Sequence, residues 1–288
     1  MLADVSSILQ AVDLGLLAAG TVCLAVFAAA LVLRRRWRDP LAGVAFPADG
    51  PTVFGLAAAV LAYLALQMAL ADVCTHGLPA AEIAQPGTSA WHRQQCGNML
   101  GQLAASAFML VLLRRARAPA ASPIHRSLAR GVALGCGGFL ALLPLVTVLW
   151  GMGVVLWKWL HPDLPPPMHP VLDALAASAW GRWGVLQLVA GAVLVAPLVE
   201  ELLFRGVILQ TVYRYWHLRW PAILASAVPF GLIHGQPQDM LPLTVMGVVL
   251  GYVRVRGGAL WPCVLVHMLF NARTIASALL APELLRAG

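Results

Sequence analysis

Residues 196–205, APLVEELLFR, place charged side chains inside an apolar part of the chain. They close a long apolar run that begins near Gly184, so they carry two adjacent carboxylates and a guanidinium to membrane depth. Ionisable side chains inside a membrane span are costly and rare, and those that occur are usually functional. We therefore expect the functional site of the protein to include this stretch.

The spacing of the charged residues in this stretch gives the two glutamates different neighbours. Successive residues of an α-helix are rotated by about 100°, so Glu200 and Glu201 cannot share a face. Glu201 and Arg205 lie four residues apart on one face and can form an ion pair. Glu200 has no partner of this kind on its own helix, which makes it the candidate general base.

The composition is that of a membrane protein. The chain has 288 residues, of which 60% are hydrophobic and 11% are charged, and its mean hydropathy is +0.81. A soluble protein carries about twice that fraction of charged residues. The formal net charge is +7, but the basic residues cluster at the ends of apolar runs, which is typical of membrane topology. The lipid bilayer, and not a nucleic acid, is therefore the expected environment.

The apolar runs predict an all-α, polytopic transmembrane helical bundle of about eight spans. The predicted spans are about 14–33, 52–70, 98–113, 131–157, 184–209, 221–234, 241–253 and 259–280. The first is interpreted as a retained helix rather than a cleaved signal peptide. A polar loop, 72–97, is expected between the second and third spans, and the sequence leaves open whether its Cys74 and Cys96 are bridged.

The distribution of arginine and lysine predicts the orientation. With the N-terminus outside, thirteen basic residues fall in inside loops and five in outside segments. Because basic residues favour the cytoplasmic side, both termini are predicted to be outside. The expected location is a bacterial-type inner (cytoplasmic) membrane, with the basic loops at 34–38 and 114–130 in the cytoplasm.

A pair of glycines in the seventh span predicts a close helix contact. Gly247 and Gly251 form a GxxxG pair, and such small residues allow two helix backbones to approach closely.

Further polar side chains fall in two later apolar runs. Together with the opening motif, they occupy three separate late helices. His234 ends one span, and His267 and Asn271 lie four residues apart on one face of another. A polar group left unsatisfied in a bundle surrounded by lipid is expensive, so these groups are expected to meet each other. The full set is Glu200, Glu201, Arg205, His234, His267 and Asn271. A network that only holds helices together remains the alternative.

The chemistry that suits this set is hydrolysis of an acyl bond. A carboxylate with a histidine can hold and deprotonate a water molecule. A histidine and an asparagine that face the same point can donate hydrogen bonds to the developing oxyanion. A covalent nucleophile is disfavoured, because Cys263 lies one turn before His267 without a partner of its own.

The sequence leaves open whether a metal takes part. The HExxH motif is absent, which excludes a zincin helix. Zinc held by Glu200, His234 and His267, with a fourth position for water, is chemically reasonable. A site without a cofactor is slightly favoured over a divalent metal, because Asn271 has an oxyanion role in either case.

Three ordered motifs resemble those of a known family. They are Glu-Glu-x-x-x-Arg at 200–205, Phe-x-x-x-His at 230–234 and His-x-x-x-Asn at 267–271. In this order on late helices they resemble the CAAX-protease and bacteriocin-processing (CPBP) family of intramembrane proteases, which includes type II CAAX prenyl endopeptidase-like and Abi-like proteins. The stretch 256–262, RGGALWP, also looks like that family, and the resemblance covers about residues 179–281.

The resemblance implies an all-helical membrane peptidase whose active site lies in a cavity inside the bundle. By analogy, Glu200 and His234 activate water, while His267 and Asn271 bind the oxyanion. The family is often labelled a metalloprotease, although the same residues support a metal-free glutamate mechanism.

The resemblance also implies supporting residues and a division of the chain. Glu201, Arg205 and Phe230 would hold the site in place. Residues 141–288 would form the protease core, with the motifs within 196–271, and residues 1–140 would be transmembrane helices of unassigned role.

The expected function is an endopeptidase that acts on a membrane-bound or membrane-proximal protein or peptide. One alternative is a non-catalytic scaffold or immunity protein of the same fold, whose mark would be a missing motif residue, and none is missing. A less favoured alternative is a proton-coupled transporter, whose mark would be an inverted repeat, and none is found. The oligomeric state is left open.

Overall fold

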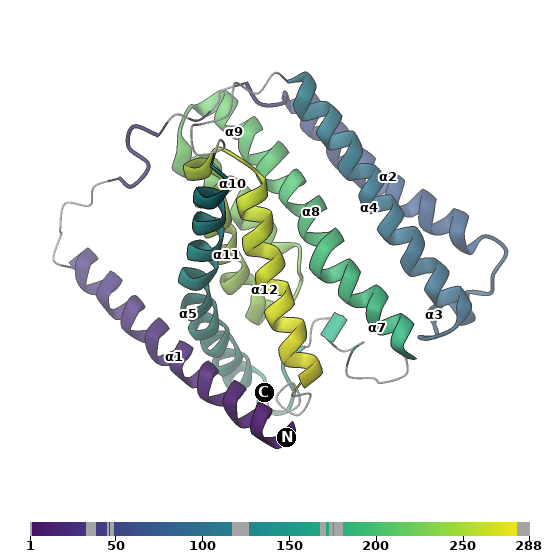
Figure 1. Ribbon diagram of the computed structural model, residues 1–288, viewed down its shortest axis with the longest axis horizontal. Coiled ribbons are helices and arrows are strands. Elements are labelled where there is room, and N and C mark those ends of the chain that lie inside the picture. Colours follow the sequence, from purple (N-terminus) through teal and green to yellow (C-terminus); the bar gives the residue numbers. More distant parts are fainter. Residues whose placement is uncertain are drawn as a thin grey trace.

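The protein is a bundle of helices. The computed structural model describes residues 2–32, 39–44, 46, 49–116, 127–167, 171–172, 175 and 181–280 (Figure 1). All regular structure within these residues is helical, so the predicted all-α fold is confirmed. The basic segments 33–38 and 117–126, parts of the predicted inside loops, lie outside the described residues.

The predicted spans correspond to the helices in order. These are α1 (Leu2–Val32), α2 (Val53–Thr75), α3 (Ala80–Ala84), α4 (Ser89–Arg115), α5 (Leu128–Leu160), α7 (Gly181–Ala190), η2 (Gly191–Val195), α8 (Ala196–Glu201), η3 (Leu202–Ile208), α9 (Leu209–Trp216), α10 (Arg219–Leu232), α11 (Pro237–Gly257) and α12 (Trp261–Leu280). Within the described residues, six helices are long and apolar enough to cross a membrane: α1, α2, α4, α5, α11 and α12. The other two predicted spans are the run from α7 to α9 and the shorter α10.

The run from α7 to α9 is a continuous rod interrupted by two π-helical segments, η2 and η3. Pro197, at the start of α8, has no N–H to donate, and its ring crowds the carbonyl four residues earlier, that of Val193. Val193 lies inside η2, so the wider π turn accommodates the proline without ending the helix. The two π segments therefore bracket the short α8, which carries both glutamates.

The glycine pair lies where α11 packs against α10, as predicted. A Cβ added at Gly247 would lie 2.8 Å from Cα of Ala227, and one at Gly251 would lie 2.9 Å from Cγ2 of Ile223. Both distances are shorter than side-chain contacts allow, so the close approach of these two helices requires glycine.

We expect Gly251→Leu to lower the yield of folded protein, because the larger side chain overlaps Ile223. Gly247→Leu should be more damaging, since the obstacle there is the backbone of α10. The measurement is the monodisperse fraction after detergent extraction. Gly137→Leu is the matched control, because a Cβ at Gly137 meets no atom within 4 Å. A folded, fully active Gly251→Leu protein would contradict the packing argument.

The loop predicted at 72–97 is wrong, because most of it is helical. Helix α2 continues to Thr75, and α4 begins at Ser89. The Oγ1 of Thr88 caps α4 by accepting a hydrogen bond from the backbone N–H of Trp91 at 3.1 Å. Cys74 and Cys96, whose bridging the sequence left open, are both free thiols in the structure.

The antiparallel hairpin of α2 and α4 packs along the rod on the side away from α1 (Figure 1). Ala59, Ala105 and Met109 of the hairpin form one buried cluster with Val199 and Leu202 of the rod. On the other side of the bundle, α5 packs against α1, α11 and α12. The division at 140/141 falls inside α5 and stays a prediction.

The segment between α1 and α2 closes one end of the bundle. Its described residues, 39–44, 46 and 49–50, are called the strap below. Leu41 and Phe46 of the strap are buried in a cluster with Leu209, Tyr213 and Ile223 from α9 and α10. The strap thus ties the first helices to the helices that follow the motif.

Polar contacts fix the strap in this position. The guanidinium of Arg214 donates to the carbonyl of Gly50 at 2.7 Å, and the indole N–H of Trp220 donates to Asp39 at 2.9 Å. The backbone N–H of Leu41 and this indole hold the pKa of Asp39 below its ordinary value. Asp39 therefore keeps its charge and its contacts at neutral pH.

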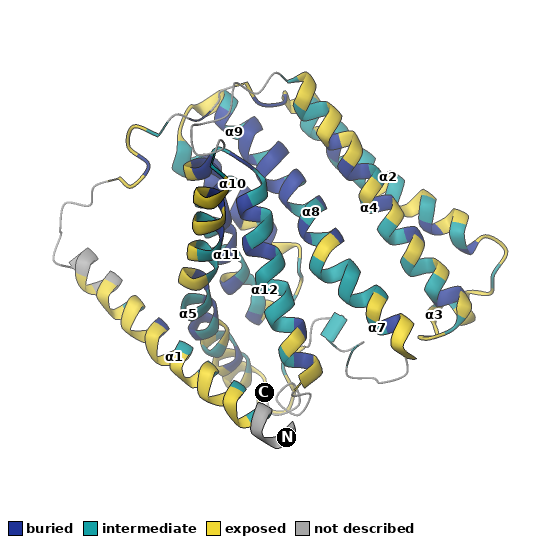
Figure 2. Ribbon diagram, in the orientation of Figure 1, coloured by how far each residue is buried: buried dark blue, intermediate teal, exposed yellow. Residues whose placement is uncertain are grey.

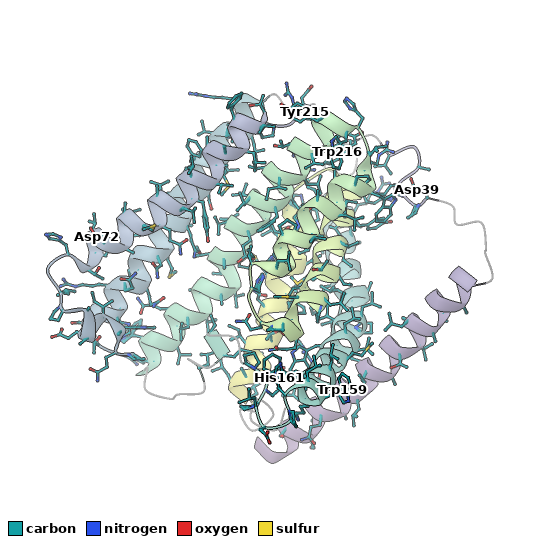
Figure 3. All side chains as sticks on the ribbon, turned by 180° about the vertical axis from the view of Figure 1, so that it is seen from behind. Asp39, Asp72, Trp159, His161, Tyr215 and Trp216 are labelled. Atoms are coloured by element: carbon teal, nitrogen blue, oxygen red, sulfur yellow. The ribbon has the colours of Figure 1, made fainter. Side chains whose placement is uncertain are left out.

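The surface of the bundle is suited to lipid. Figure 2 shows exposed residues along the outer faces of α1, α2 and α4, and buried ones where α8 to α12 meet. Figure 3 shows Tyr215 and Trp216 at one end of the bundle and Trp159 at the other. All three aromatic side chains are exposed, and such residues concentrate at membrane–water interfaces. The protein is an integral, multi-pass membrane protein.

Candidate active site

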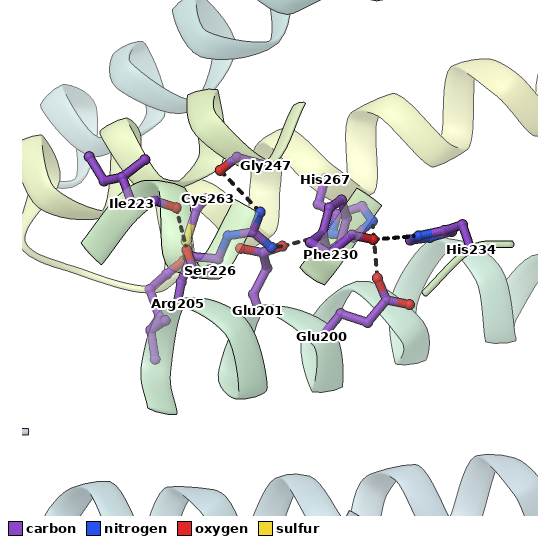
Figure 4. Close-up of polar contacts among 11 residues, drawn as sticks. Glu200, Glu201, Arg205, Ile223, Ser226, Phe230, His234, Gly247, Cys263 and His267 are labelled. Carbon is purple, nitrogen blue, oxygen red and sulfur yellow. Dashed lines mark hydrogen bonds and ion pairs between the residues drawn. The ribbon is translucent and has the colours of Figure 1, made fainter. Parts of the chain in front are cut away.

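The centre of the bundle holds a buried ion pair. Glu201 of α8 and Arg205 of η3 form the predicted pair, with Nη1 2.8 Å from Oε1 and both side chains fully buried (Figure 4). Nη2 of Arg205 also donates to the carbonyl of Gly247 at 3.2 Å. The pair is thereby joined to the helix contact made by the glycine pair.

Phe230 of α10 packs against the charged and aromatic groups of the site. Its ring centre lies 4.4 Å from Cζ of Arg205, a cation–π contact. The same ring meets the rings of Phe204, His234 and His267 edge to face, with centres 5.1 to 5.6 Å apart. Phe230 is completely buried, and its ring packs between these neighbours.

His267 of α12 connects the two glutamates. Its Nδ1 lies 2.9 Å from Oε1 of Glu201, and its Nε2 lies 3.8 Å from Oε2 of Glu200. An ionised carboxylate only accepts hydrogen bonds, so Nδ1 carries a proton in the contact with Glu201. Because the side chain is only 4% exposed, the ring is held in one orientation with Nε2 toward Glu200.

The adjacent glutamates have different surroundings. The side chain of Glu201 is 0% exposed, whereas that of Glu200 is 22% exposed. Oε2 of Glu200 has no hydrogen-bond partner among the described residues. One carboxylate is therefore held by Arg205 and His267, while the other is open to the space beside the helix.

His234 follows the end of α10 and turns back toward it. Its Nδ1 donates to the carbonyl of Phe230 at 2.8 Å. Pro229 and the helix end at Leu232 place this histidine in a turn rather than inside a span. In this tautomer a neutral His234 carries its lone pair on Nε2.

Asn271 lies one turn after His267 on α12. Its Nδ2 donates to the carbonyl of Ala192 at 2.7 Å, inside the π segment η2. One N–H of the amide is used in this contact, which ties α12 to the widened turn of the rod.

A cavity of about 590 Å³ collects these side chains. Glu200, His234, His267 and Asn271, which the sequence analysis selected, all line it. Glu201 and Arg205 lie behind them in the core. The structure therefore brings residues of all three ordered motifs together at one cavity.

The side chains do not form an evident metal site. No group of three or more His, Cys, Asp or Glu side chains in the described part of the chain is placed to hold a metal ion. The candidate zinc set of Glu200, His234 and His267 does not converge in this arrangement.

Sequence reasoning missed three features of the site. The contact of His267 with Glu201 was not foreseen, nor were the π segments on either side of α8. Amide side chains of α2 and α4 that line the cavity were also missed. The helical spacing of the amide residues of α4 in the sequence was the signal that could have predicted their shared face.

Comparisons with known proteins cover the same part of the chain. Residues 182–273 match the family described as type II CAAX prenyl endopeptidase Rce1-like. A relative from Bacillus subtilis (strain 168), named "Putative membrane peptidase YdiL", is 26% identical over 78 residues, which cover 27% of this chain and 32% of that protein.

Another relative is the "Uncharacterized 24.3 kDa protein" of Escherichia coli. It is 37% identical over 106 residues, which cover 35% of this chain and 48% of that protein. The chain thus spans about a third and about half the length of these two curated relatives. No solved structure matches the chain significantly.

The family match contains every residue of the three motifs, and the helices that it covers supply Glu200, His234, His267 and Asn271 to the cavity. The resemblance of this chain to the CAAX-protease and bacteriocin-processing family of intramembrane proteases is thereby confirmed for residues 182–273.

Proposed function

We propose that this protein is an intramembrane endopeptidase that cleaves a membrane-bound or membrane-proximal protein or peptide. The supporting observation is the contrast between the adjacent glutamates. Oε1 of Glu201 is held by both Arg205 and His267, while Glu200 lines the cavity with Nε2 of His267 3.8 Å away. A carboxylate that is open to a cavity is available to act on a water molecule.

In the proposed reaction, Glu200 is the general base. Its carboxylate takes a proton from a water molecule while the water oxygen attacks the carbonyl carbon of the substrate. His234, which lines the same cavity, helps to hold that water through Nε2.

His267 and Asn271 are assigned to the oxyanion. With Nδ1 donating to Glu201, the ring of His267 holds Nε2 on the side of Glu200, where an N–H at this atom would donate to the oxyanion. Asn271 uses one N–H for Ala192 and has a second to donate. Donors fixed in place before the reaction stabilise the charge that develops on the carbonyl oxygen.

The collapse of the tetrahedral intermediate completes the reaction. The C–N bond breaks, and the proton that Glu200 removed from water passes to the leaving nitrogen. One water is consumed, and the products are a new carboxyl end and a new amine end. Glu200 is then ionised again for the next turnover.

We propose this route without a metal. It rests on the contacts that hold His267 and Asn271 in place, and the zinc ligand set does not converge among the described residues. No step of the route passes through a metal ion.

The proposal is tested by purifying the full chain in detergent and incubating it with a library of membrane-inserting peptides. We expect cleavage at defined bonds, which mass spectrometry identifies. The cleavage rate should be unchanged after treatment with a chelator, and metal analysis of the sample should accompany this measurement. A scaffold or immunity protein would produce no cleavage. A transporter would instead move protons in sealed vesicles, which a pH-sensitive dye detects.

The orientation of the protein in the inner membrane is also a proposal, with both termini outside. In a variant without native cysteines, we expect Gln85→Cys to be labelled by an impermeant thiol reagent in cells without an outer membrane. Arg115→Cys, at the other end of α4, should be labelled only after the membrane is opened. The reverse pattern would contradict this topology.

A further inference from the structure

A row of carboxamide side chains lines the cavity wall formed by the α2–α4 hairpin. Gln67 of α2 and Gln95, Asn98 and Gln102 of α4 all border the same cavity as Glu200. The three residues of α4 lie at positions i, i+3 and i+7, so they share one face of the helix. These four residues are called the amide row below.

The amide row is not used to join helices. Among the described residues, the side-chain amides of Gln67, Gln95 and Gln102 make no hydrogen bond, and Asn98 only accepts one from Gln94 at 3.2 Å. Gln187 is a contrast within the same cavity, since its amide donates to the backbone of His92 at 3.4 Å. Amides within a membrane span need partners, so the amide row has free capacity for a ligand.

The amide row leads toward the reactive carboxylate. Helix α4 runs alongside the rod in the same direction, with His92 beside Gln187, Met99 beside Gly191 and Leu113 beside Gly206. The hydrogen bond of Gln187 shows the first of these pairs. The contacts that a Cβ on either glycine would make, 3.9 Å to Met99 and 2.9 Å to Leu113, show the other two. The same offset places Gln102 roughly five residues before Glu200, about 7 Å along the helix axis.

The wall of the cavity formed by α5 has the opposite character. Leu143, Val146, Trp150 and Val154 of α5 line it, with Thr147 as the polar exception. The cavity therefore offers hydrogen-bonding groups from the hairpin and mainly apolar surface from α5.

We infer that the amide row binds the backbone of an extended, uncharged peptide segment, whose apolar side chains lie against α5. A carboxamide both donates and accepts, which complements the N–H and C=O of a peptide, whereas a hydrocarbon chain offers neither. The rise from Gln95 to Gln102 is about 10 Å, the length of about three extended residues. Main-chain hydrogen bonds supply affinity in this way wherever an extended peptide is recognised.

This inference rests on the proposed function, since it names the substrate class of that site. The hairpin then selects a polypeptide in extended form, and Glu200 acts on the bond that follows the held segment.

The test uses dye-labelled short peptides of Leu, Ala and Val, and the same peptides methylated on alternate backbone nitrogens. Binding is measured by fluorescence anisotropy with the full chain in lipid nanodiscs. Glu200→Gln is present in every protein, so that the probes stay intact. The test variant adds Gln95→Met and Gln102→Met, which keep side-chain length and remove hydrogen bonding. Gln10→Met is the matched control, because Gln10 is exposed on α1 and does not line the cavity.

We expect the double substitution to weaken binding of the unmethylated peptides about tenfold, the loss of two or so ordinary hydrogen bonds. Methylation of the peptide backbone should weaken binding to the protein with an intact amide row by a similar factor. For the methylated peptides, the two substitutions should weaken binding little further. The comparison of methylated with unmethylated peptides uses the protein with an intact amide row, so it does not depend on how the variant folds. Equal binding of the two probe sets, or no binding of either, overturns the inference.

A separate assay with Glu200 present distinguishes the two proposals. Amide-dependent binding without cleavage would leave the inference standing and remove the endopeptidase function. Cleavage that neither backbone methylation nor the amide-row substitutions alter would support the endopeptidase function and remove the inference.

Discussion

Glu200→Gln is expected to leave the protein folded and to lower its turnover by about 10²–10⁴-fold, the usual effect of removing a general base. The amide keeps the size of the side chain and loses the ability to take a proton. Oε2 of Glu200 makes no hydrogen bond to a described residue, so little native contact is lost. The measurements are the cleavage rate of a peptide found in the library screen and the thermal unfolding of the detergent-solubilised protein.

Glu82→Gln is the matched control for this change. Glu82 is exposed on α3, far along the chain from the motifs, and the same substitution there should alter neither quantity. A Glu200→Gln protein that cleaves at the rate of the wild type would remove the mechanism, whatever else the fold does.

Glu201→Gln is expected to lower the free energy of unfolding by about 3–5 kcal/mol, because it leaves a buried charge without its counterion. Arg205 has no route to water, since its side chain is fully buried between Gly247 and the ring of Phe230. His267 loses its carboxylate acceptor at the same time, so activity should fall together with stability. Thermal unfolding and the cleavage rate report the two effects separately.

Arg205→Met combined with Glu201→Gln should recover part of that stability. The methionine keeps apolar contact with Phe230 and removes the unpaired charge, so the two substitutions should be non-additive. Activity should stay low, because His267 still lacks its partner. Additive losses, or a Glu201→Gln protein as stable as the wild type, would show that the pair does not hold the site together.

The parts of the site that lie on one helix could be predicted from the sequence. The pairing of Glu201 with Arg205 and the shared face of His267 and Asn271 follow from a helical repeat of 3.6 residues. The close contact at Gly247 and Gly251 followed in the same way, since residue size alone limits how near two backbones can come.

The parts of the site that depend on how the helices are rotated relative to each other could not be predicted from the sequence. His267 contacts Glu201 and also approaches Glu200, and only the rotation of α12 against α8 decides this. The π segments alter the rotation of the rod, and the crowding of Val193 by Pro197 was the one local signal for them. The early start of α4 was missed because its glutamines read as a polar loop, although a helix tolerates them where they face a cavity.

The strap has a consequence for the order in which the protein assembles during synthesis. Asp39 is made 181 residues before Trp220, and Gly50 is made 164 residues before Arg214. At the usual speed of a ribosome this interval lasts on the order of ten to thirty seconds. During that time Leu41 and Phe46 have no core to enter, while α1, α2, α4 and α5 already pass into the bilayer. The end of the bundle can close only after α9 and α10 have emerged, so the hairpin waits for its place beside Glu200 until the later helices arrive.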